Sequence, residues 1–282
     1  MKRTFIILGI ILAVWVILAQ SCMQFRISDN DAKKKFSDAG VALYTETVTV
    51  DGFNMHYVKT GNDSFPTLFF VHGSPGSWEA FSRYLEDKDL LAKYRMISVD
   101  RPGFGDSEFG NAKNLNDQSR LISPLLSLTK NSKPVYIIGH SLGGPMAIRL
   151  AADNPEFFSG IVLLAGSVDP AEEKPEKWRP ILYRTPLKFL VPGAMRPSNE
   201  ELWYLKNDLL LLKKDFSKID CPVYIIHGDK DNLVPVGNAA YAKEMLVNAK
   251  KVETKILPGA SHFIPWQHYD EIKEVLMGLD KE

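Results

Sequence analysis

One serine of this chain lies between two glycines at a spacing that suits covalent catalysis. Gly139, Ser141 and Gly143 follow the apolar run at residues 135–138 and precede a stretch with helical periodicity. Glycines at these positions permit a tight strand-to-helix turn, which presents the serine hydroxyl at the N-terminus of the helix. A serine hydroxyl attacks an acyl carbon efficiently only when a base removes its proton. The pattern therefore predicts Ser141 as a nucleophile that needs a partner base.

The base is predicted among six histidines, of which His262 has the best position. It lies in the loop after the last predicted strand, so a parallel sheet would deliver it to the same edge as the nucleophile. The other histidines lie inside neighbouring motifs (His72 and His140), in an early hairpin (His56) or on a helix surface (His268). The sequence therefore favours His262 as the general base.

A carboxylate must hold the imidazole in the right tautomer, and three aspartates compete for that role. Asp231 occupies the acid position of a Gly-x-x-Asp-x-x-Val-Pro pattern at residues 228–235, directly after an apolar run. Asp229 falls in the bend of the same loop, where we expect it to accept hydrogen bonds from backbone N–H groups. Asp169 follows the strand after Ser141 and is the third option. The pattern favours Asp231.

Acyl transfer also needs hydrogen-bond donors for the negatively charged oxygen of a tetrahedral intermediate. The sequence His-Gly-Ser-Pro-Gly at residues 72–76 directly follows another apolar run. Pro75 has no N–H, so the backbone N–H of Ser74 is the predicted donor from this loop. The second predicted donor is the N–H of Leu142, at a helix start. A phosphate-binding loop is the alternative, but the lysine and the spacing of a P-loop are missing here.

These residues need a sheet that brings the ends of distant strands to one edge. Short apolar runs, typical of strands buried on both faces, recur at residues 68–71, 96–99, 135–138, 161–164, 223–226 and 252–257. Stretches with helical spacing occur at residues 78–94, 114–128, 142–152, 238–249 and 266–279. A hairpin at residues 45–59 precedes them. Strands that alternate with helices predict an α/β fold with a mainly parallel sheet covered on both faces.

One insertion, at about residues 168–218, interrupts this alternation. Ser198 and Glu201 fit a capping box, which predicts a helix over residues 199–214. The insertion is expected to form a small helical lid over the strand ends, and a surface excursion without a catalytic part is the alternative. Its aromatic side chains suggest an apolar pocket, although each could instead belong to the lid's own core: Trp178, Tyr183, Phe189, Trp203 and Tyr204.

The motifs resemble those of the α/β-hydrolase superfamily over residues 41–281. The order of Ser141, Asp231 and His262 along the chain is that of the superfamily's catalytic triad. Residues 72–75 resemble its oxyanion loop, and residues 100–107 resemble a structural turn that borders its pocket. The resemblance implies a mainly parallel eight-stranded sheet with helices on both faces and a small helical lid.

The resemblance also implies roles for single residues. Ser141, Asp231 and His262 would form the triad, while Ser74 and Leu142 would supply the oxyanion hole. Epoxide hydrolases and haloalkane dehalogenases of this fold carry an aspartate nucleophile, so the serine argues against both. The overall pattern is closest to esterase-like, aminopeptidase-like and carbon–carbon-bond hydrolase members with small lids, and fold alone does not choose between them.

The expected activity is hydrolysis of a small or medium carboxylic ester through an acyl-enzyme, with no cofactor and no metal. Several alternatives use the same triad: amide or N-terminal proline cleavage, lactone hydrolysis, carbon–carbon bond hydrolysis, acyl transfer and perhydrolysis. A non-catalytic binding module is the alternative of a different class. The intact set of triad residues argues against it.

Composition limits the remaining classes of function. Of 282 residues, 45% are hydrophobic and 24% are charged, which excludes a disordered chain, a collagen-like fibre and a multi-pass membrane protein. Lysine plus arginine and aspartate plus glutamate each number 34, so no basic surplus indicates a nucleic-acid partner. The expected ligand is a small acyl substrate, and the oligomeric state stays open. Two cysteines, Cys22 and Cys221, exclude a disulfide scaffold.

The N-terminus is predicted to be an export segment. Lys2 and Arg3 precede an apolar run at residues 5–19, which is shorter than the roughly twenty residues that a spanning helix needs. The run ends in small residues before Cys22, which resembles a bacterial lipoprotein box and implies that the signal is cut before this cysteine, which then receives lipid. Ordinary cleavage after Ser21, without lipid, and an uncleaved anchor are the alternatives. The expectation is an exported chain held to a membrane.

Three parts of the chain follow from these assignments. Residues 1–21 are the predicted signal segment. Residues 22–40 are polar and lysine-rich and are predicted to be a tether or a leading helix. Residues 41–282 are the predicted α/β-hydrolase domain.

Overall fold

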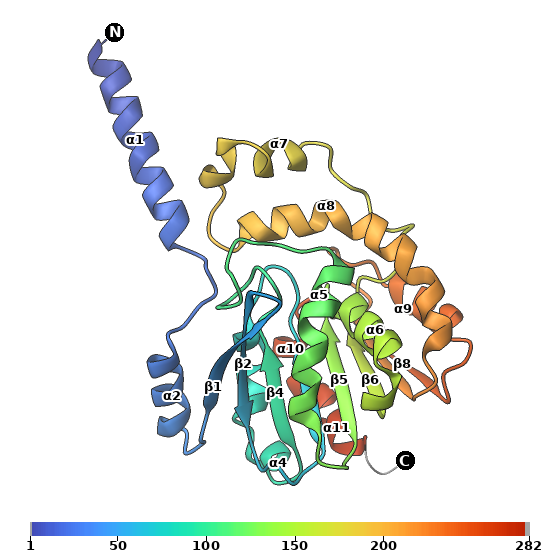
Figure 1. Cartoon of the computed structure of the whole chain (residues 1–282). Helices are drawn as coiled ribbons and strands as arrows, with labels where there is room; N and C mark the ends of the chain where they lie inside the picture. The colour runs from blue at the N-terminus through green and yellow to red at the C-terminus, as the bar shows by residue number, and fades with distance from the viewer. Residues whose placement is uncertain (1, 280–282) are drawn as a thin grey trace.

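The computed structural model describes residues 2–279, so the first residue of the predicted signal segment and the last three of the predicted domain lie outside it. Within the described part, eight strands form one sheet in the order β1-β2-β4-β3-β5-β6-β7-β8 (Figure 1). Strand β2 is antiparallel to both of its neighbours, and the other strands run parallel. Their bounds are β1 Tyr44–Val50, β2 Phe53–Thr60, β3 Thr67–Val71, β4 Arg95–Val99, β5 Val135–His140, β6 Gly160–Leu164, β7 Val223–Gly228 and β8 Val252–Leu257. The predicted eight-stranded, mainly parallel sheet is confirmed.

The α-helices lie on both faces of this sheet and at its edges. The longer ones in the described part are α1 Lys2–Ser21, α2 Asp29–Asp38, α5 Leu115–Ile122, α6 Gly143–Asp153, α8 Met195–Leu212, α9 Gly237–Met245 and α11 Tyr269–Gly278. The short ones are α3 Ser82–Leu85, α4 Lys88–Leu91, α7 Arg179–Tyr183 and α10 Ile264–Gln267. Turns of 3-10 helix are η1 Trp78–Phe81, η2 Ser123–Thr129, η3 Pro155–Phe157, η4 Pro186–Leu190 and η5 Lys213–Lys218.

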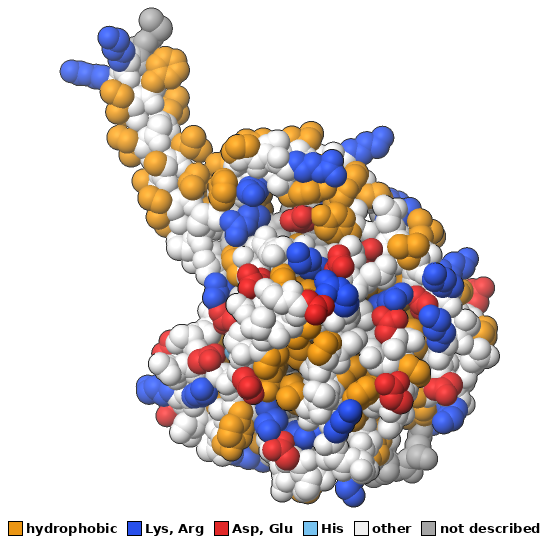
Figure 2. All heavy atoms as spheres, viewed as in Figure 1, with side chains coloured by type: hydrophobic (Ala, Val, Ile, Leu, Met, Phe, Trp, Pro, Cys, Tyr) orange, Lys and Arg blue, Asp and Glu red, His pale blue; other side chains and the backbone are white. Residues whose placement is uncertain are grey.

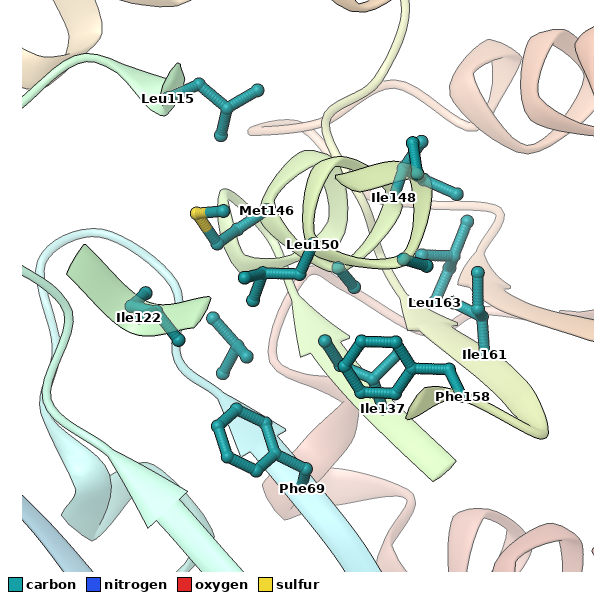
Figure 3. Packing of buried hydrophobic residues seen from close by; sticks show 14 of the residues in the cluster. Phe69, Leu115, Ile122, Ile137, Met146, Ile148, Leu150, Phe158, Ile161 and Leu163 are labelled. Atoms are coloured by element: carbon teal, nitrogen blue, oxygen red, sulfur yellow. The ribbon is translucent and has the colours of Figure 1, made fainter. Parts of the chain in front are cut away.

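Two apolar clusters, one on each face, bury the sheet. Successive residues of a strand point to opposite faces, and Phe69 and Phe70 accordingly belong to different clusters. On one face, Ile137 and Leu163 belong to the same cluster as Met146 and Ile148 of α6 (Figure 3). All six residues of β5 are buried. Burial on both faces explains why these strands read as continuous apolar runs in the sequence.

Two helix predictions need correction. The stretch 78–94 is not one helix: it divides into η1, α3 and α4, and Asp87 accepts a hydrogen bond from the Leu90 N–H at the start of α4. Such side chains compete with helix continuation. The capping box is also wrong, because α8 begins at Met195 and Ser198 lies inside its first turns.

The regular secondary structure of the insertion between β6 and β7 is all helical. We call residues 168–218 the lid segment; it contains α7, η4, α8 and η5. Figure 1 shows α7 and α8 lying across one edge of the sheet, above α5 and α6. This is the edge at which the parallel strands end, because Ser141, directly after β5, lies beneath the lid segment in the cavity described below.

The N-terminal region contains two helices. Helix α2 falls within the predicted tether or leading helix, begins after Ser28 and buries Ala32 and Phe36 against the domain. Helix α1 is 20 residues long, so it spans roughly 30 Å at 1.5 Å per residue. It is the one helix of the described part that is long and apolar enough to cross a membrane, and a signal sequence passes the same test. The predicted apolar run was shorter, so its length no longer argues against a span.

Candidate active site

Ser141 stands in the turn between β5 and α6 with a backbone angle that non-glycine residues rarely adopt. Its φ is 55°, in the left-handed region, where a side chain costs strain. The flanking glycines are required by close approach: a Cβ on Gly139 would lie 2.1 Å from the carbonyl oxygen of Gly143, and one on Gly143 would lie 2.1 Å from that of Val71. Ser141 faces a cavity and is otherwise buried.

His262 lines the same cavity as Ser141, and the buried Asp231 contacts its ring. The Nδ1 atom of His262 lies 2.7 Å from Oδ2 of Asp231. The other carboxylate oxygen accepts hydrogen bonds from the N–H groups of Leu233, at 2.9 Å, and Val234, at 2.8 Å. With Nδ1 engaged, Nε2 is the ring nitrogen of His262 that remains for the cavity, which Ser141 also lines. The structure thus brings all three predicted triad residues to one place.

The competing aspartates have different partners. Asp229 accepts a hydrogen bond from the Gly259 N–H at 2.7 Å, as expected for a residue in the bend. Asp169 accepts one from the Ala171 N–H at 2.8 Å. Among the described residues, Asp231 is the aspartate that pairs with His262.

Electrostatics keep Asp231 ionised. Burial alone would raise the pKa of Asp231, but hydrogen bonds from His227, His262 and the Val234 N–H outweigh it and hold the pKa well below its ordinary value. His227 lies 3.5 Å from the carboxylate and also donates to the Val234 carbonyl at 2.9 Å. A negative carboxylate at this position stabilises a positively charged imidazole at His262.

His140 packs against His262, the predicted base. Its Nε2 lies 3.2 Å from the carbonyl oxygen of His262, and the two rings are 4.9 Å apart. Burial, and secondarily the nearby His262, lowers the pKa of His140 to about 3, so its ring is neutral and can accompany a charged His262. His140 was set aside as a base candidate and His227 was given no role, because their contacts to His262 and Asp231 were not visible from residue spacing.

Both predicted oxyanion donors border the nucleophile. Loop 72–76 approaches so closely that a Cβ on Gly73 would lie 2.8 Å from Cβ of Ser141. Ser74 lines the cavity beside Ser141. Leu142 directly precedes α6, where backbone N–H groups lack partners within the helix. The two N–H groups therefore come from elements that meet at Ser141.

Arg101 connects the oxyanion loop to the lid segment. Its guanidinium is buried and donates to the carbonyl oxygens of His72, at 2.8 Å, and Gly73, at 3.0 Å. It also pairs with the carboxylate of Glu201 in α8 and donates to Gln118 at 3.0 Å. The sequence analysis treated this turn as structural and assigned Glu201 to a helix cap. A contact across so many residues of sequence had no local signal.

The cavity has a volume of about 830 Å³. Residues of the lid segment close one side of it, among them Arg179, Met195 and Leu202, and Phe25 enters from the N-terminal region. The lid aromatics predicted for the pocket are absent from its described lining: Trp178 and Phe189 are exposed, and Tyr183 packs against Tyr204. These side chains therefore do not line the pocket, and the contact of Tyr183 with Tyr204 agrees with the alternative of a lid core. Phe263 and Trp266 beside His262 supply the aromatic surface instead.

A second polar cluster lies behind the site. The ligand-type atoms of His56, Asp100 and Asp106 lie within 4.8 Å of one another, a spacing that a metal ion could use. The Asp100 carboxylate lies 2.8 Å from Nδ1 of His56 and accepts a hydrogen bond from the Trp78 N–H at 2.7 Å. Asp106 forms an ion pair with Arg26. These contacts fix the turn after β4, and we interpret the cluster as structural.

Comparisons with known proteins agree with this architecture. A family model described as the alpha/beta hydrolase fold matches residues 66–191. A hydrolase from Paraburkholderia phymatum, named for 2-hydroxy-6-oxononadienedioate and 2-hydroxy-6-oxononatrienedioate, is 27% identical over 79% of this chain and 89% of its own length. A serine hydrolase structure from Cycloclasticus zankles superposes with a TM-score of 0.68 at 18% identity, covering 86% of this chain and all of the other.

One further structure extends over the N-terminal helix as well. It is described as a membrane phospholipase A and a bacterial virulence factor, covers 100% of both chains, and has a TM-score of 0.64 at 20% identity. Sheet, nucleophile turn and comparisons together define the class: the chain has the α/β-hydrolase fold. It is an enzyme, a hydrolase.

Proposed function

We propose that this chain is a serine hydrolase that cleaves a small or medium carboxylic ester through an acyl-enzyme. The observation that carries the proposal is the 2.7 Å contact of Asp231 with His262 beside a strained Ser141 in one cavity. A nucleophile and a base that line one cavity, with a carboxylate that orients the base, make up the machinery of acyl transfer. No metal or cofactor is required for this chemistry.

In the proposed reaction, His262 takes the Ser141 proton while the serine oxygen bonds to the acyl carbon. The N–H groups of Ser74 and Leu142 stabilise the oxyanion, and Asp231 stabilises the imidazolium. The tetrahedral intermediate then expels the alcohol, which receives the proton from His262. Water, activated by the same base, attacks the acyl-enzyme and releases the acid and the free serine.

The second candidate is carbon–carbon bond hydrolysis on the same residues, because several relatives with about a quarter of their residues identical are named for dienedioate substrates. A dianionic substrate calls for a surplus of cations in the cavity. The lining instead holds three carboxyl groups against two cations, and one of the cations, Arg179, already pairs with Glu176. The charge balance therefore favours an uncharged ester.

The test combines covalent labelling with turnover. A fluorophosphonate should label the parent chain, and Ser141→Ala should abolish both the label and ester turnover, the latter by about a million-fold. Ser167→Ala is the matched control, since Ser167 lines the same cavity. Retention of the label in Ser141→Ala would reject the serine mechanism. Turnover of a ring-cleaved dienedioate in preference to every ester would instead select the second candidate.

We further propose that the N-terminal segment exports the chain and holds it to a membrane. Cys22 is exposed and directly follows α1, as lipid attachment requires. Helix α1 is itself apolar, and 6% of its most apolar window is buried in the fold. Lipid on Cys22 and a retained α1 are two forms of this attachment. Both would hold the chain to the membrane at the junction of Ser21 and Cys22.

A further inference from the structure

The lid segment carries apolar side chains on the outside, where packing does not require them. Trp178 is 47% exposed and Ile181 is 58% exposed in and around α7, and Leu187 and Phe189 of η4 are 42% and 44% exposed. Figure 2 shows hydrophobic side chains continuing from α1 across to the lid segment, with Lys and Arg side chains among them. We call these four residues the lid patch.

The lid patch lies beside the end of α1. Trp15 donates through its indole Nε1 to the Leu190 carbonyl at 3.1 Å, and Gln20 donates to the Phe189 carbonyl at 2.8 Å. The Gly193 N–H donates to the Ala19 carbonyl at 2.7 Å. These bonds fix η4 against the last turns of the apolar helix.

The place at which the η4 turn contacts α1 determines how deep that turn would lie in a bilayer that α1 crosses. A helix of 20 residues matches a hydrocarbon core of roughly 30 Å, so its last turns lie at the boundary of a bilayer that it crosses. Trp15 and Ser21 are separated by roughly 9 Å along the axis. The η4 turn, which contacts this stretch, would therefore lie at the depth where interfacial segments bury their apolar faces, about 5–10 Å.

Attachment through lipid gives the same placement. A Cβ on Gly193 would lie 2.2 Å from the Cys22 carbonyl oxygen, so Cys22 sits directly against the lid segment. Acyl chains on Cys22 would enter the bilayer beside η4. The lid patch would therefore lie next to the bilayer in either form of attachment.

Charge supports a lipid surface as the occupant. The stretch 178–196 contains four arginine and lysine residues and no aspartate or glutamate. Arg184 and Lys188 lie over the rings of Tyr183 and Phe189, each at 5.3 Å, and no carboxylate pairs with either within the described residues. Long cationic side chains next to aromatic rings are typical of membrane interfaces, where they reach anionic headgroups.

We propose that the lid patch is a membrane-contact surface that lies in the headgroup region of an anionic bilayer. The proposal rests on the N-terminal attachment proposed above and does not depend on the chemistry at Ser141. It would place the entrance side of the cavity, to which Phe25 and Met195 contribute, next to the lipid.

The experiment measures the depth of single side chains in the full chain. In a Cys22→Ser, Cys221→Ala background, α1 is retained, and Leu187→Cys is labelled with bimane. The matched control is Leu210→Cys, because Leu210 is 54% exposed on α8 but lies toward the end of that helix away from α1 (Figure 1). The protein is reconstituted into phosphatidylcholine–phosphatidylglycerol vesicles, with flotation as the readout of attachment.

Phosphatidylcholine brominated on its acyl chains should quench the Leu187 label by about twofold and leave the Leu210 label unchanged. Replacement of Arg184 and Lys188 by glutamine should remove the dependence of this quenching on phosphatidylglycerol. If the chain floats with the vesicles and both labels stay equally bright, the lid patch is not a membrane-contact surface, but the N-terminal attachment stands. A chain that does not float would overturn the attachment as well. Disulfide formation between two unlabelled Leu187→Cys chains under air oxidation, with no quenching of the labelled protein, would assign the patch to a second copy and reject the bilayer.

Discussion

At the residue scale, backbone strain at Ser141 and hydrogen bonding at Asp231 have different effects on the candidate site. The positive φ of Ser141 turns its hydroxyl into the cavity, and the surrounding glycines make that backbone path possible. The network around Asp231 has no part in shaping this turn. It sets the charge and the tautomer of His262 instead.

Asp231→Asn tests that division. The variant should fold normally, because asparagine keeps the size and the acceptor for the Val234 N–H, but turnover should fall by about ten-thousand-fold through the wrong tautomer of His262. Turnover and circular dichroism would be measured together.

Asp229→Asn is the matched control, since this residue lies in the same loop and bonds Gly259. It should lose far less activity. Equal losses at the two positions, or a larger loss in Asp169→Asn, would contradict the assignment of Asp231.

His140 should make the fold sensitive to acid. Burial lowers its pKa to about 3 from an ordinary value of 6.5, so the unfolded chain binds a proton that the folded chain rejects between those limits. Stability is thus lost as the pH falls below 6.5. The free energy of unfolding in urea should decline less steeply in His140→Asn than in the parent, by about 1.4 kcal/mol per pH unit.

Other groups titrate near this window as well, and each is unchanged in the variant. Burial, and secondarily Arg101, holds the pKa of His72 well below its ordinary value, so His72 lowers stability in acid as His140 does. Burial lowers the pKa of His56 but hydrogen bonding and charge at Asp100 outweigh it and raise it, so His56 acts in the opposite direction. Asp231 loses its contribution only below its ordinary value of 3.8. All three are present in parent and variant, so the difference in slope isolates His140. Identical slopes in the two proteins would contradict the prediction.

At the element scale, one ion pair joins the lid segment to the oxyanion loop. Arg101 holds the carbonyl groups of residues 72 and 73 with one part of its guanidinium and Glu201 of α8 with the other. Both side chains are buried, so neither charge is compensated by water. The position of α8 and the position of the loop are therefore coupled through one side chain.

Glu201→Ala should destabilise the protein by about 3–5 kcal/mol, because it leaves the Arg101 charge buried without its partner. The measurement is chemical denaturation with the parent as reference. Glu200→Ala serves as the control on the same helix, since Glu200 is only half-buried and contacts Tyr204. It should cost less than about 1 kcal/mol. Similar losses for the two variants would show that the ion pair does not carry the coupling.

The strands and the nucleophile turn could be predicted from sequence because their signals are local. Burial on both faces writes a continuous apolar run into each strand, and the Gly139 and Gly143 contacts leave only glycine possible. Helix limits were less predictable, since Asp87 begins a new element inside the periodic stretch 78–94. The lid segment was hardest: Glu201 satisfies a local cap pattern but bonds a residue far away in sequence.

At the scale of the whole molecule, the N-terminus, the lid segment and the cavity share one side. Phe25, just after α1, lines the cavity together with Met195 of the lid segment. The Gly193 N–H bonds the Ala19 carbonyl, so the lid segment is also fixed to α1. The proposed attachment and the cavity are therefore structurally connected.

Cys22→Ala tests the form of the attachment. If lipid on Cys22 holds the chain, cells fed labelled palmitate should give a labelled, detergent-extractable protein, and the variant should lose the label, because the cysteine thiol is the site of modification. Cys221→Ala is the control, since this thiol is buried and should not affect labelling. A soluble exported chain that begins at Cys22 without lipid would contradict the attachment. An unlabelled, membrane-bound chain would select a retained α1.

The lid segment begins after β6 and ends before β7, and these strands are hydrogen-bonded neighbours. Its two ends are therefore already held together by the sheet, whatever lies between them. Doubling the length of such a closed loop costs only about 0.6 kcal/mol in chain entropy. The nucleophile turn tolerates no added methyl group at Gly139 or Gly143 without a backbone clash. Descendants of this chain are thus free to exchange or lengthen the lid, and with it their substrates, while the turn that would perform the chemistry is held constant.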